Sequence, residues 1–325
     1  MPTPWNWRPS EPARLERPVT LLRLEGTDSR RFLHGQTSAA IELAPPGAWI
    51  PTCCISPTGR MRALAEVLVD GEGAWLVVSA GDGEAVRSAL DRVLFPADQV
   101  GLGTLEPARL ITVLPPVSPD SGPMAAPAAP LSWGELGGGV GWRLGASWLL
   151  RDGAPLPAEL AALPALGDHD QERWRLQQGL PAASAELNDD TNPFELGLAD
   201  RVSLSKGCYV GQETLAKLAT YDGVKQQLRR WHWCQRPEGS PAAATVPEPG
   251  TVLLHPDNPD GGRAGRVTSA LQLDGGDWIG LALVRRQALE APALLLGPEP
   301  GAGLARLSVP EAFTPPPVGS GSQGR

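Results

Sequence analysis

Lysine and tyrosine are scarce in this sequence, since all three lysines and both tyrosines lie between positions 206 and 225. Positive charge elsewhere is carried by arginine, which indicates a coding bias that replaces lysine wherever a generic cation suffices. A compact ammonium and a planar guanidinium do different work, so the residues that escaped the bias are expected to be needed as they are. Residues 206–225 are therefore the first place to look for function, with an accidental cluster as the alternative.

Cysteine and histidine are also rare. The four cysteines are Cys53, Cys54, Cys208 and Cys234, and the four histidines are His34, His169, His232 and His255. The cysteines show neither a disulfide framework nor a zinc spacing, which fits a reducing compartment. The histidines show no metal or catalytic-triad spacing, so we expect no metal site. Cys53 and Cys54 are neighbours in an apolar strand, where they face opposite sides and do not share one metal ion.

Long apolar runs and excess basic charge are absent as well. No stretch approaches the length of a membrane span, and residues 1–18 lack the apolar segment of a signal peptide. The net charge of −8 gives no general surface for nucleic acid or anionic membranes. We therefore expect a soluble, cytoplasmic protein with no membrane partner and no direct nucleic-acid binding.

The order of secondary-structure signals predicts an α+β protein. Residues 61–69 alternate in polarity, a Gly-rich turn follows, and residues 74–79 form a second strand. Residues 82–95 and 171–178 have helical patterns, the second ending at Gly179. Strand signals at 251–255, 263–270, 278–284 and 304–309, separated by Gly and Asp turns, predict a small C-terminal β-barrel.

Composition divides the chain into three parts. Residues 1–225 are expected to form an α+β region that contains a flexible Pro- and Ala-rich loop at 115–130. Residues 226–313 are expected to form the barrel. Residues 314–325 are expected to be a disordered tail.

Within the lysine-containing segment, two glycines bracket Cys208 before a helix-favouring run begins at Gln212. The thiol would lie near a helix N-terminus and near Lys206, and both would favour thiolate over thiol. Gly211 would let a ligand approach the backbone closely. The alternative is that Cys208 is a small buried apolar residue, as most lone cysteines are.

The octapeptide Lys-Gly-Cys-Tyr-Val-Gly-Gln-Glu at 206–213 resembles the signature of the YgfZ family, folate-binding relatives of the glycine cleavage T-protein that maintain iron–sulfur enzymes. Other blocks match the family in the same order. They lie at 32–38, 56–60, 175–181, 192–198, 265–269 and 280–286. The similarity extends from about residue 19 to residue 309, and the octapeptide is its most specific part. Ala39-Ala40 departs from the pattern, because relatives often carry Asp there.

The resemblance implies a T-protein-like multidomain architecture around a central folate-sized opening. It implies a tetrahydrofolate-binding accessory factor in iron–sulfur cluster assembly or repair, which supports enzymes such as tRNA methylthiolation proteins. Its partners would be folate and iron–sulfur assembly proteins or client enzymes. Cys208 would be the functional thiol, with Lys206 as its electrostatic partner. The residues expected to contact folate are Gln36, Arg60, Trp174, Arg175, Asn192, Glu195, Tyr209, Gly211, Gln212 and Glu213.

Folate binding also has a physical rationale in these residues. A pterin offers a donor edge that Glu195 and Asn192 would accept, a flat face for Trp174, and a glutamate tail for Arg175 or Lys206. The alternatives are ordinary, because Glu195 would equally cap a turn, Trp174 would lie in a core and Arg175 would be solvated. Pockets use only a few placed polar groups, so not all of these residues are expected to touch a ligand.

Two further interpretations concern charge. T-proteins carry an acidic pair in the strand where this chain has Arg62 and Ala63, and neither residue replaces a carboxylate in aminomethyl transfer. Aminomethyltransferase activity is thus the alternative function rather than the favoured one, and the chain is not expected to be a classical enzyme. The basic residues Arg229 and Arg230 beside Trp231 fit a single-stranded nucleic-acid site, but a solvated strand end is favoured.

Overall fold

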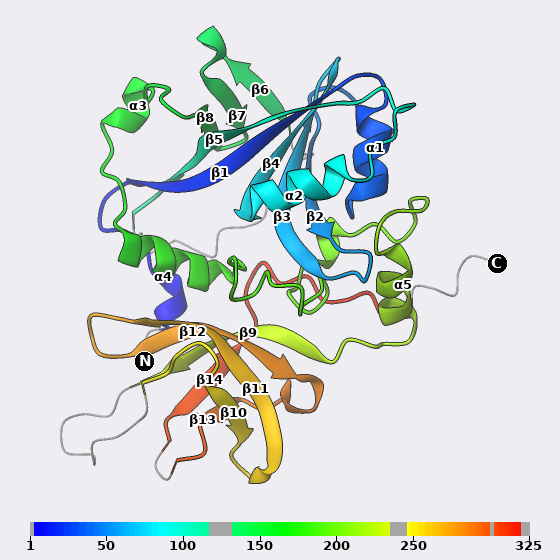
Figure 1. Cartoon of the computed structure of the whole chain (residues 1–325). Coiled ribbons are helices and arrows are strands. Elements are labelled where there is room, and N and C mark those ends of the chain that lie inside the picture. Colours follow the sequence, from blue (N-terminus) through cyan, green and yellow to red (C-terminus); the bar gives the residue numbers. More distant parts are fainter. Residues whose placement is uncertain (1–2, 117–131, 235–245, 300–301, 320–325) are drawn as a thin grey trace.

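The computed structural model describes residues 3–116, 132–234, 246–299 and 302–319, and shows a large sheet above a barrel (Figure 1). The expected loop at 115–130 lies outside the described residues, apart from positions 115 and 116. The sheet strands are β1 (Ala13–Glu25), β2 (Trp49–Ile55), β3 (Met61–Val69), β4 (Gly73–Gly81), β5 (Gly101–Leu114), β6 (Trp133–Leu136), β7 (Gly141–Leu144) and β8 (Ser147–Arg151). They lie in the order β2-β3-β4-β1-β5-β8-β7-β6, and every pair is antiparallel.

The predicted C-terminal barrel is present. Its strands are β9 (Gln226–Trp233), β10 (Val252–His255), β11 (Asn258–Gln272), β12 (Trp278–Arg285), β13 (Ala293–Leu296) and β14 (Leu304–Ser308). They close in the order β10-β11-β12-β9-β14-β13. Closure pairs every strand on both sides, so the barrel has no free edge.

The helices are α1 (Ser29–Gln36), α2 (Gly83–Asp91), α3 (Ala158–Ala161), α4 (Asp168–Gln178) and α5 (Gln212–Thr220). Phe32 and Leu33 of α1 and Val86 and Leu90 of α2 pack against the apolar face of β3 and β4. Helix α4 ends where the sequence predicts, because Gly179 adopts a left-handed conformation with φ of 71°. Figure 1 places α4 and α5 between the sheet and the barrel, at opposite sides of the molecule. No helix in the described part of the chain is long and apolar enough to cross a membrane.

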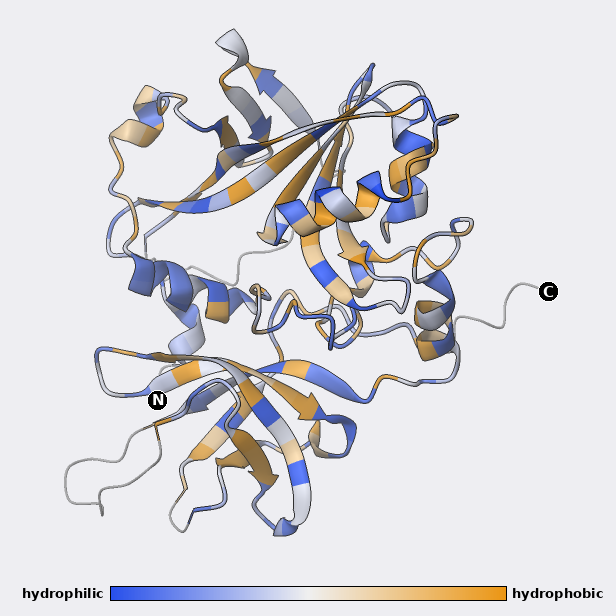
Figure 2. Cartoon of the chain, in the orientation of Figure 1, coloured by the Kyte–Doolittle hydropathy of each residue, from blue (hydrophilic) through white to orange (hydrophobic). Residues whose placement is uncertain are grey.

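One packed cluster joins the sheet to the barrel. It contains Met61 and Leu64 from β3, Leu215 from α5, and Ile279 and Leu281 from β12. Figure 2 shows the corresponding apolar stripes on these strands, whereas α4 is mostly hydrophilic. Because the cluster is continuous, the loop that precedes α5 is seated on both parts of the molecule.

The basic pair in β9 corrects the sequence interpretation. Arg229 and Arg230 are buried rather than solvated, with 8% and 6% of their surface exposed. The Arg230 guanidinium donates to the carbonyl oxygens of Gln177 at 2.8 Å and Val309 at 3.0 Å, and it lies over the Trp5 ring. Arginine therefore ties the barrel to α4 and to the N-terminal segment, since its planar fork reaches several acceptors at once.

The C-terminal segment also differs from the expected tail. Thr314 forms a β-bridge with Leu198, and the Gly319 N–H donates to the Ala219 carbonyl at 3.2 Å. Phe313 packs against the cluster that joins sheet and barrel. Residues 314–319 thus have defined contacts with the first part of the chain, and residues 320–325 lie outside the described range.

Candidate functional site

Cys208 lies in the loop just before α5 and is the exposed member of the four cysteines, all of which the structure describes. Cys53 and Cys54 are buried in β2, and burial raises the pKa of each thiol to about 12. They belong to different packed clusters, as expected for successive residues of a strand. Cys234 is partly exposed. A thiol must be accessible to react with or bind a partner, so exposure singles out Cys208.

Lys206 is buried beneath this loop, with 7% of its surface exposed. Its ammonium donates to the carbonyl oxygens of Thr37 and Ala39, each at 2.6 Å, and to that of His34. These carbonyls lie at and just beyond the C-terminal end of α1, where the helix dipole favours a cation. All three ammonium donors are therefore used on backbone acceptors. Burial lowers the pKa of Lys206 to about 7.

The contacts of Lys206 give it a structural role. The contacts described for its ammonium are the three carbonyls and the Tyr209 ring, whose centroid lies 4.3 Å away. No hydrogen bond or ion pair with Cys208 is found among the described residues. Lys206 thus holds the loop on α1 through these contacts, and its electrostatic effect on the Cys208 thiol stays a prediction.

Tyr209 and Gln212 fix the conformation of the loop through packing and hydrogen bonds. The Tyr209 ring is buried in the cluster between sheet and barrel, and burial raises the pKa of its hydroxyl to about 12. That hydroxyl is buried and has no hydrogen-bond partner among the described residues. The Gln212 side-chain amide donates to the Lys206 carbonyl at 3.2 Å, and its backbone N–H donates to the Tyr209 carbonyl at 3.2 Å. The backbone on both sides of Cys208 is therefore fixed.

Gly211 begins α5 in a left-handed conformation with φ of 77°. A Cβ at this position would lie 2.7 Å from the Ser56 carbonyl oxygen and 3.1 Å from the Gly59 Cα. Gly59 is itself left-handed, and a Cβ there would lie 3.2 Å from the Thr214 Cβ. The close approach expected at Gly211 is thus made by the chain's own turn between β2 and β3.

Glu213 points into solvent from the first turn of α5. It forms an i,i+4 ion pair with Lys217, with an N–O distance of 2.6 Å, and both side chains are exposed. Such a pair supports a helix. Among the described residues, no hydrogen bond or ion pair joins the Glu213 side chain to another expected folate residue.

Glu195, Asn192 and Arg60 lie together. The Asn192 Oδ1 accepts from the backbone N–H groups of Phe194 and Glu195, at 3.0 and 3.1 Å, and so forms a tight turn. Glu195 is buried, and its Oε2 accepts from the Asn192 N–H at 3.1 Å and lies 4.0 Å from the Arg60 guanidinium. Burial raises the pKa of Glu195, while the Asn192 N–H and Arg60 oppose that rise.

The side chains of Arg175 and Trp174 make contacts with the barrel and with a packed core. The Arg175 guanidinium binds both carboxylate oxygens of Glu172 at 2.7 Å and donates to the Ser269 hydroxyl of β11 at 2.8 Å. It also lies 3.6 Å from the fully buried Glu186 carboxylate. Trp174 packs in a cluster with Ala13, Leu15, Leu114 and Leu166. Arg175 therefore joins α4 to the barrel, and Trp174 is a core residue.

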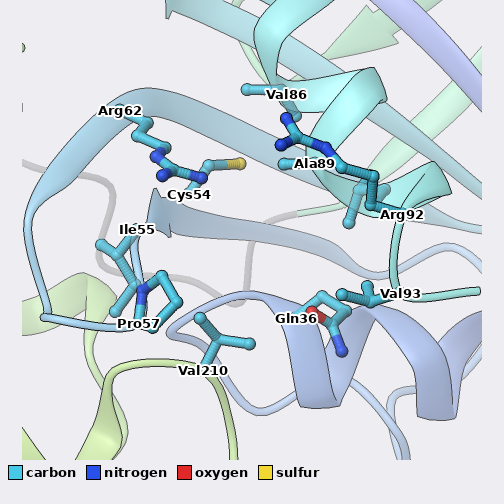
Figure 3. Close-up of a pocket in the computed structure, with 11 residues that line it drawn as sticks. Gln36, Cys54, Ile55, Pro57, Arg62, Val86, Ala89, Arg92, Val93 and Val210 are labelled. Atoms are coloured by element: carbon cyan, nitrogen blue, oxygen red, sulfur yellow. The ribbon is translucent and has the colours of Figure 1, made fainter.

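Gln36 lines a cavity of about 270 Å³ beside the loop. Val210, two residues after Cys208, lines the same cavity, together with Arg62 from β3 and Arg92, which follows α2 (Figure 3). A second cavity, of about 370 Å³, shares Arg62 and Arg92 and extends to Asp189. Among the expected folate residues in the described chain, Gln36 is the one that lines either cavity.

At the two positions of β3 where the resemblance to T-proteins places an acidic pair, this chain has Arg62 and Ala63, and the carboxylate of this strand is Glu66, further along. Ala63 is fully buried in the sheet core, and the Arg62 guanidinium lies 3.5 Å from Asp189. The chemistry expected of a paired carboxylate is not available at these two positions.

The structure therefore brings the expected residues together in three groups rather than one. The loop holds Lys206, Cys208, Tyr209, Gly211 and Gln212, and its Val210 lines one cavity together with Gln36 of α1. The turn holds Arg60, Asn192 and Glu195, while Trp174 and Arg175 serve the core and the barrel contact. The sequence analysis listed the turn at 56–60 among the matched blocks but gave Ser56 and Gly59 no role, and the structure shows that this turn seats Gly211. Their Ser-Pro-Thr-Gly turn pattern was the available signal.

Comparison with known proteins gives relatives by sequence. The chain is 30% identical over 295 residues to a chloroplastic protein of Arabidopsis thaliana that is named only provisionally as a transferase; the match covers 82% of this chain and 63% of that protein. It is 28% identical over 301 residues to the mitochondrial iron–sulfur cluster assembly factor IBA57 of Mus musculus, covering 84% of this chain and 77% of that protein. No family model matches the chain.

Comparison with solved structures gives the fold. The glycine cleavage system aminomethyltransferase T from Bartonella henselae superposes with a TM-score of 0.66, covering 96% of this chain and 88% of that one. Sequence identity is 16%, so this likeness concerns the fold alone. It confirms the predicted α+β architecture with a C-terminal barrel.

Proposed function

Since the chain is a YgfZ-family relative of the glycine cleavage T-protein, we propose that it is an accessory factor in iron–sulfur cluster assembly or repair and that Cys208 is its functional thiol. The observation that carries this proposal is the exposure of Cys208 on a loop in which Lys206 and Tyr209 are buried and Lys206 and Gln212 are hydrogen-bonded. An exposed thiol on a braced loop is suited to contact with another protein.

The thiol acts with a partner in this proposal. Iron–sulfur clusters are held by several thiolates, so one cysteine supplies one ligand while a partner supplies the others. Cys208 therefore binds a cluster in transit or meets a partner's cluster at an interface. The clients are iron–sulfur enzymes such as tRNA methylthiolation proteins, and the compartment remains the cytoplasm, although the relatives include mitochondrial and chloroplastic proteins.

Tetrahydrofolate is the proposed ligand, and the turn at 192–195 supports it. The Glu195 carboxylate is buried and accepts from the Asn192 N–H through Oε2, with a further side-chain hydrogen bond from Gln226. A carboxylate has about four acceptor sites, so capacity is left for the donor edge of a pterin. The unpartnered Tyr209 hydroxyl belongs to the same packed cluster as Phe194 and Leu196, which flank Glu195. When bound, the folate would supply one-carbon chemistry, and this chain's residues would bind and orient it.

The loop is tested by complementation of a YgfZ-deficient strain, scored on the activity of an iron–sulfur enzyme. We expect rescue by the wild type and by Glu159→Gln, a control change of an exposed carboxylate on α3, and loss of rescue by Cys208→Ser. Circular dichroism checks that all three proteins fold. Rescue by Cys208→Ser would show that the thiol is not the functional group, and failure of the wild type would remove the assembly function itself.

The ligand is tested separately by calorimetric titration with tetrahydrofolate. We expect Glu195→Gln to weaken binding at least about tenfold, since a carboxylate accepts charge-assisted hydrogen bonds that an amide does not. Glu172→Gln, a change in the network that joins α4 to the barrel, is the control and should bind as the wild type does. Turnover of an aminomethyl donor that survives Cys208→Ser would instead favour the aminomethyltransferase alternative.

A further inference from the structure

Three side chains with different metal-binding atoms converge at one end of the barrel. They are His232 of β9, Cys234 just after it, and Asp277 just before β12. The ligand atoms of all three lie within 4.8 Å of one another. The His232 Nε2 lies 2.9 Å from the Asp277 Oδ2 and 3.5 Å from the Cys234 Sγ.

The strand register brings these residues together. In the antiparallel pair of β9 and β12, His232 lies opposite Ile279, and Trp233 lies opposite Trp278. One further step along this ladder sets Cys234 opposite Asp277. Since side chains alternate along a strand, His232 and Cys234 share one face. The turn from 273 to 277 is closed by a hydrogen bond from the Leu273 N–H to the Asp277 carbonyl, at 2.8 Å, which fixes the third member.

The arrangement differs from a catalytic triad. In a Cys-His-Asp triad the imidazole uses one nitrogen toward the nucleophile and the other toward the carboxylate. Here the same nitrogen, Nε2, faces both the thiol and the carboxylate. This is the pattern of a metal ligand set, in which a nitrogen, a sulfur and an oxygen all face one position.

We propose that His232, Cys234 and Asp277 bind one divalent cation of the zinc class. Tetrahedral zinc, with bonds of about 2.3 Å to sulfur and about 2.0 Å to nitrogen, separates those two ligand atoms by about 3.5 Å. The observed distance between Cys234 Sγ and His232 Nε2 is 3.5 Å. The Asp277 carboxylate lies at hydrogen-bond distance from the His232 imidazole, which is shorter than the separation of two ligand atoms on one zinc ion. Binding of the ion therefore requires the carboxylate to move outward by roughly half an ångström.

The surroundings suit a cation of this kind. The His232 side chain is 14% exposed and that of Asp277 is 35% exposed, so the site is half-buried and open to water on one side. Three protein ligands leave a fourth position for water. Binding forms a metal–sulfur bond and releases the thiol proton to solvent.

This site is independent of the function proposed for Cys208, and it revises the expectation of no metal site. The sequence signal was His-x-Cys on a strand, but the third ligand is 43 positions further along the chain and becomes its neighbour only through the barrel.

Titration of the purified full-length protein with Co²⁺ tests the proposal, because a thiolate bound to Co²⁺ gives a charge-transfer absorption that other ligands do not. We expect one equivalent of Co²⁺ with this absorption in the wild type and in Cys208→Ser, and loss of the absorption in Cys234→Ser. Zn²⁺ should displace the Co²⁺. Asp277→Asn should retain the absorption and weaken affinity at least about tenfold.

His232→Gln provides a second variant that keeps the thiol, and near-ultraviolet circular dichroism checks that each variant is folded. We expect His232→Gln to weaken Co²⁺ binding strongly. Absorption that persists in Cys234→Ser, or its disappearance in Cys208→Ser, would overturn the proposal. So would a folded wild type that binds no stoichiometric Co²⁺ or Zn²⁺.

Discussion

Lys206 and Lys217 stand eleven positions apart in one segment, yet they occupy opposite environments. Lys206 is buried under the loop and donates to three carbonyls of the α1 end. Lys217 lies on the solvent side of α5, and its ion pair within the described part of the chain is with Glu213. Both belong to the segment that the scarcity of lysine singled out, but only the contacts of Lys206 require a lysine side chain. Three donors that radiate from one nitrogen match three convergent carbonyls, whereas a planar guanidinium does not.

The largest expected effect comes from removing the buried ammonium. Lys206→Met keeps much of the side-chain volume but leaves three backbone carbonyls without their donor. We expect a loss of about 3 kcal/mol in the free energy of unfolding, since one unsatisfied buried polar group costs about 1–3 kcal/mol and water reaches part of the site. Urea denaturation measures it. A stability equal to that of the wild type would contradict the bracing role of Lys206.

The pH dependence of stability sharpens the same comparison. The folded-state pKa of Lys206 is lowered from 10.5 to about 7, so between these values the unfolded chain binds more protons than the folded one. Stability of the wild type relative to Lys206→Met should therefore rise as the pH increases through this window. A flat or falling difference would refute the lowered pKa.

The next effect on stability is expected from substitutions at two glycines of the loop, Gly211 and Gly207. Gly211→Ala introduces a Cβ into a left-handed position 2.7 Å from the Ser56 carbonyl oxygen, and we expect a loss of about 2 kcal/mol. Gly207→Ala is the matched control, because a Cβ there meets no heavy atom within 4 Å. It should change stability by less than about 0.5 kcal/mol. Equal losses in the two variants would show that the contact with the β2–β3 turn does not matter.

The smallest effect is expected at the exposed lysine. Lys217→Met breaks a solvent-exposed ion pair with Glu213, which salt screens and which orders two long side chains. The midpoint of urea denaturation should stay within experimental error of the wild type. A loss comparable to that of Lys206→Met would show that the two lysines are not different in kind.

Local patterns predicted much of this fold. The β3–β4 hairpin, helix α2, the end of α4 at Gly179 and four barrel strands follow from alternation, helical periodicity and turn residues. Strand β5 was missed because Gly101, Gly103 and Pro107 interrupt its pattern, although β1 pairs along its length. Pairing partners distant in sequence compensate for such breaks, and no local rule contains them.

The site was predicted less completely for the same reason. The octapeptide located Cys208, and its exposure agrees with the role expected from the resemblance. The partner of Lys206 could not be read from the sequence, because the carbonyls it binds lie about 170 positions earlier in the chain. A match to the family also does not show which side chains face a ligand. Arg175 and Trp174 lie at or beside a matched block, yet their contacts are with the barrel and the core.

The close contact between Gly59 and Gly211 has a consequence for association. It ties the backbone beside Cys208 to the turn of the large sheet, so the thiol is presented by chain that is already ordered. Ordering a side chain on binding costs about 0.5–1.5 kcal/mol, and ordering a whole loop costs several times more. A molecule that docks at Cys208 therefore meets a preorganised surface, on which the entropy still to be lost is confined to one short side chain.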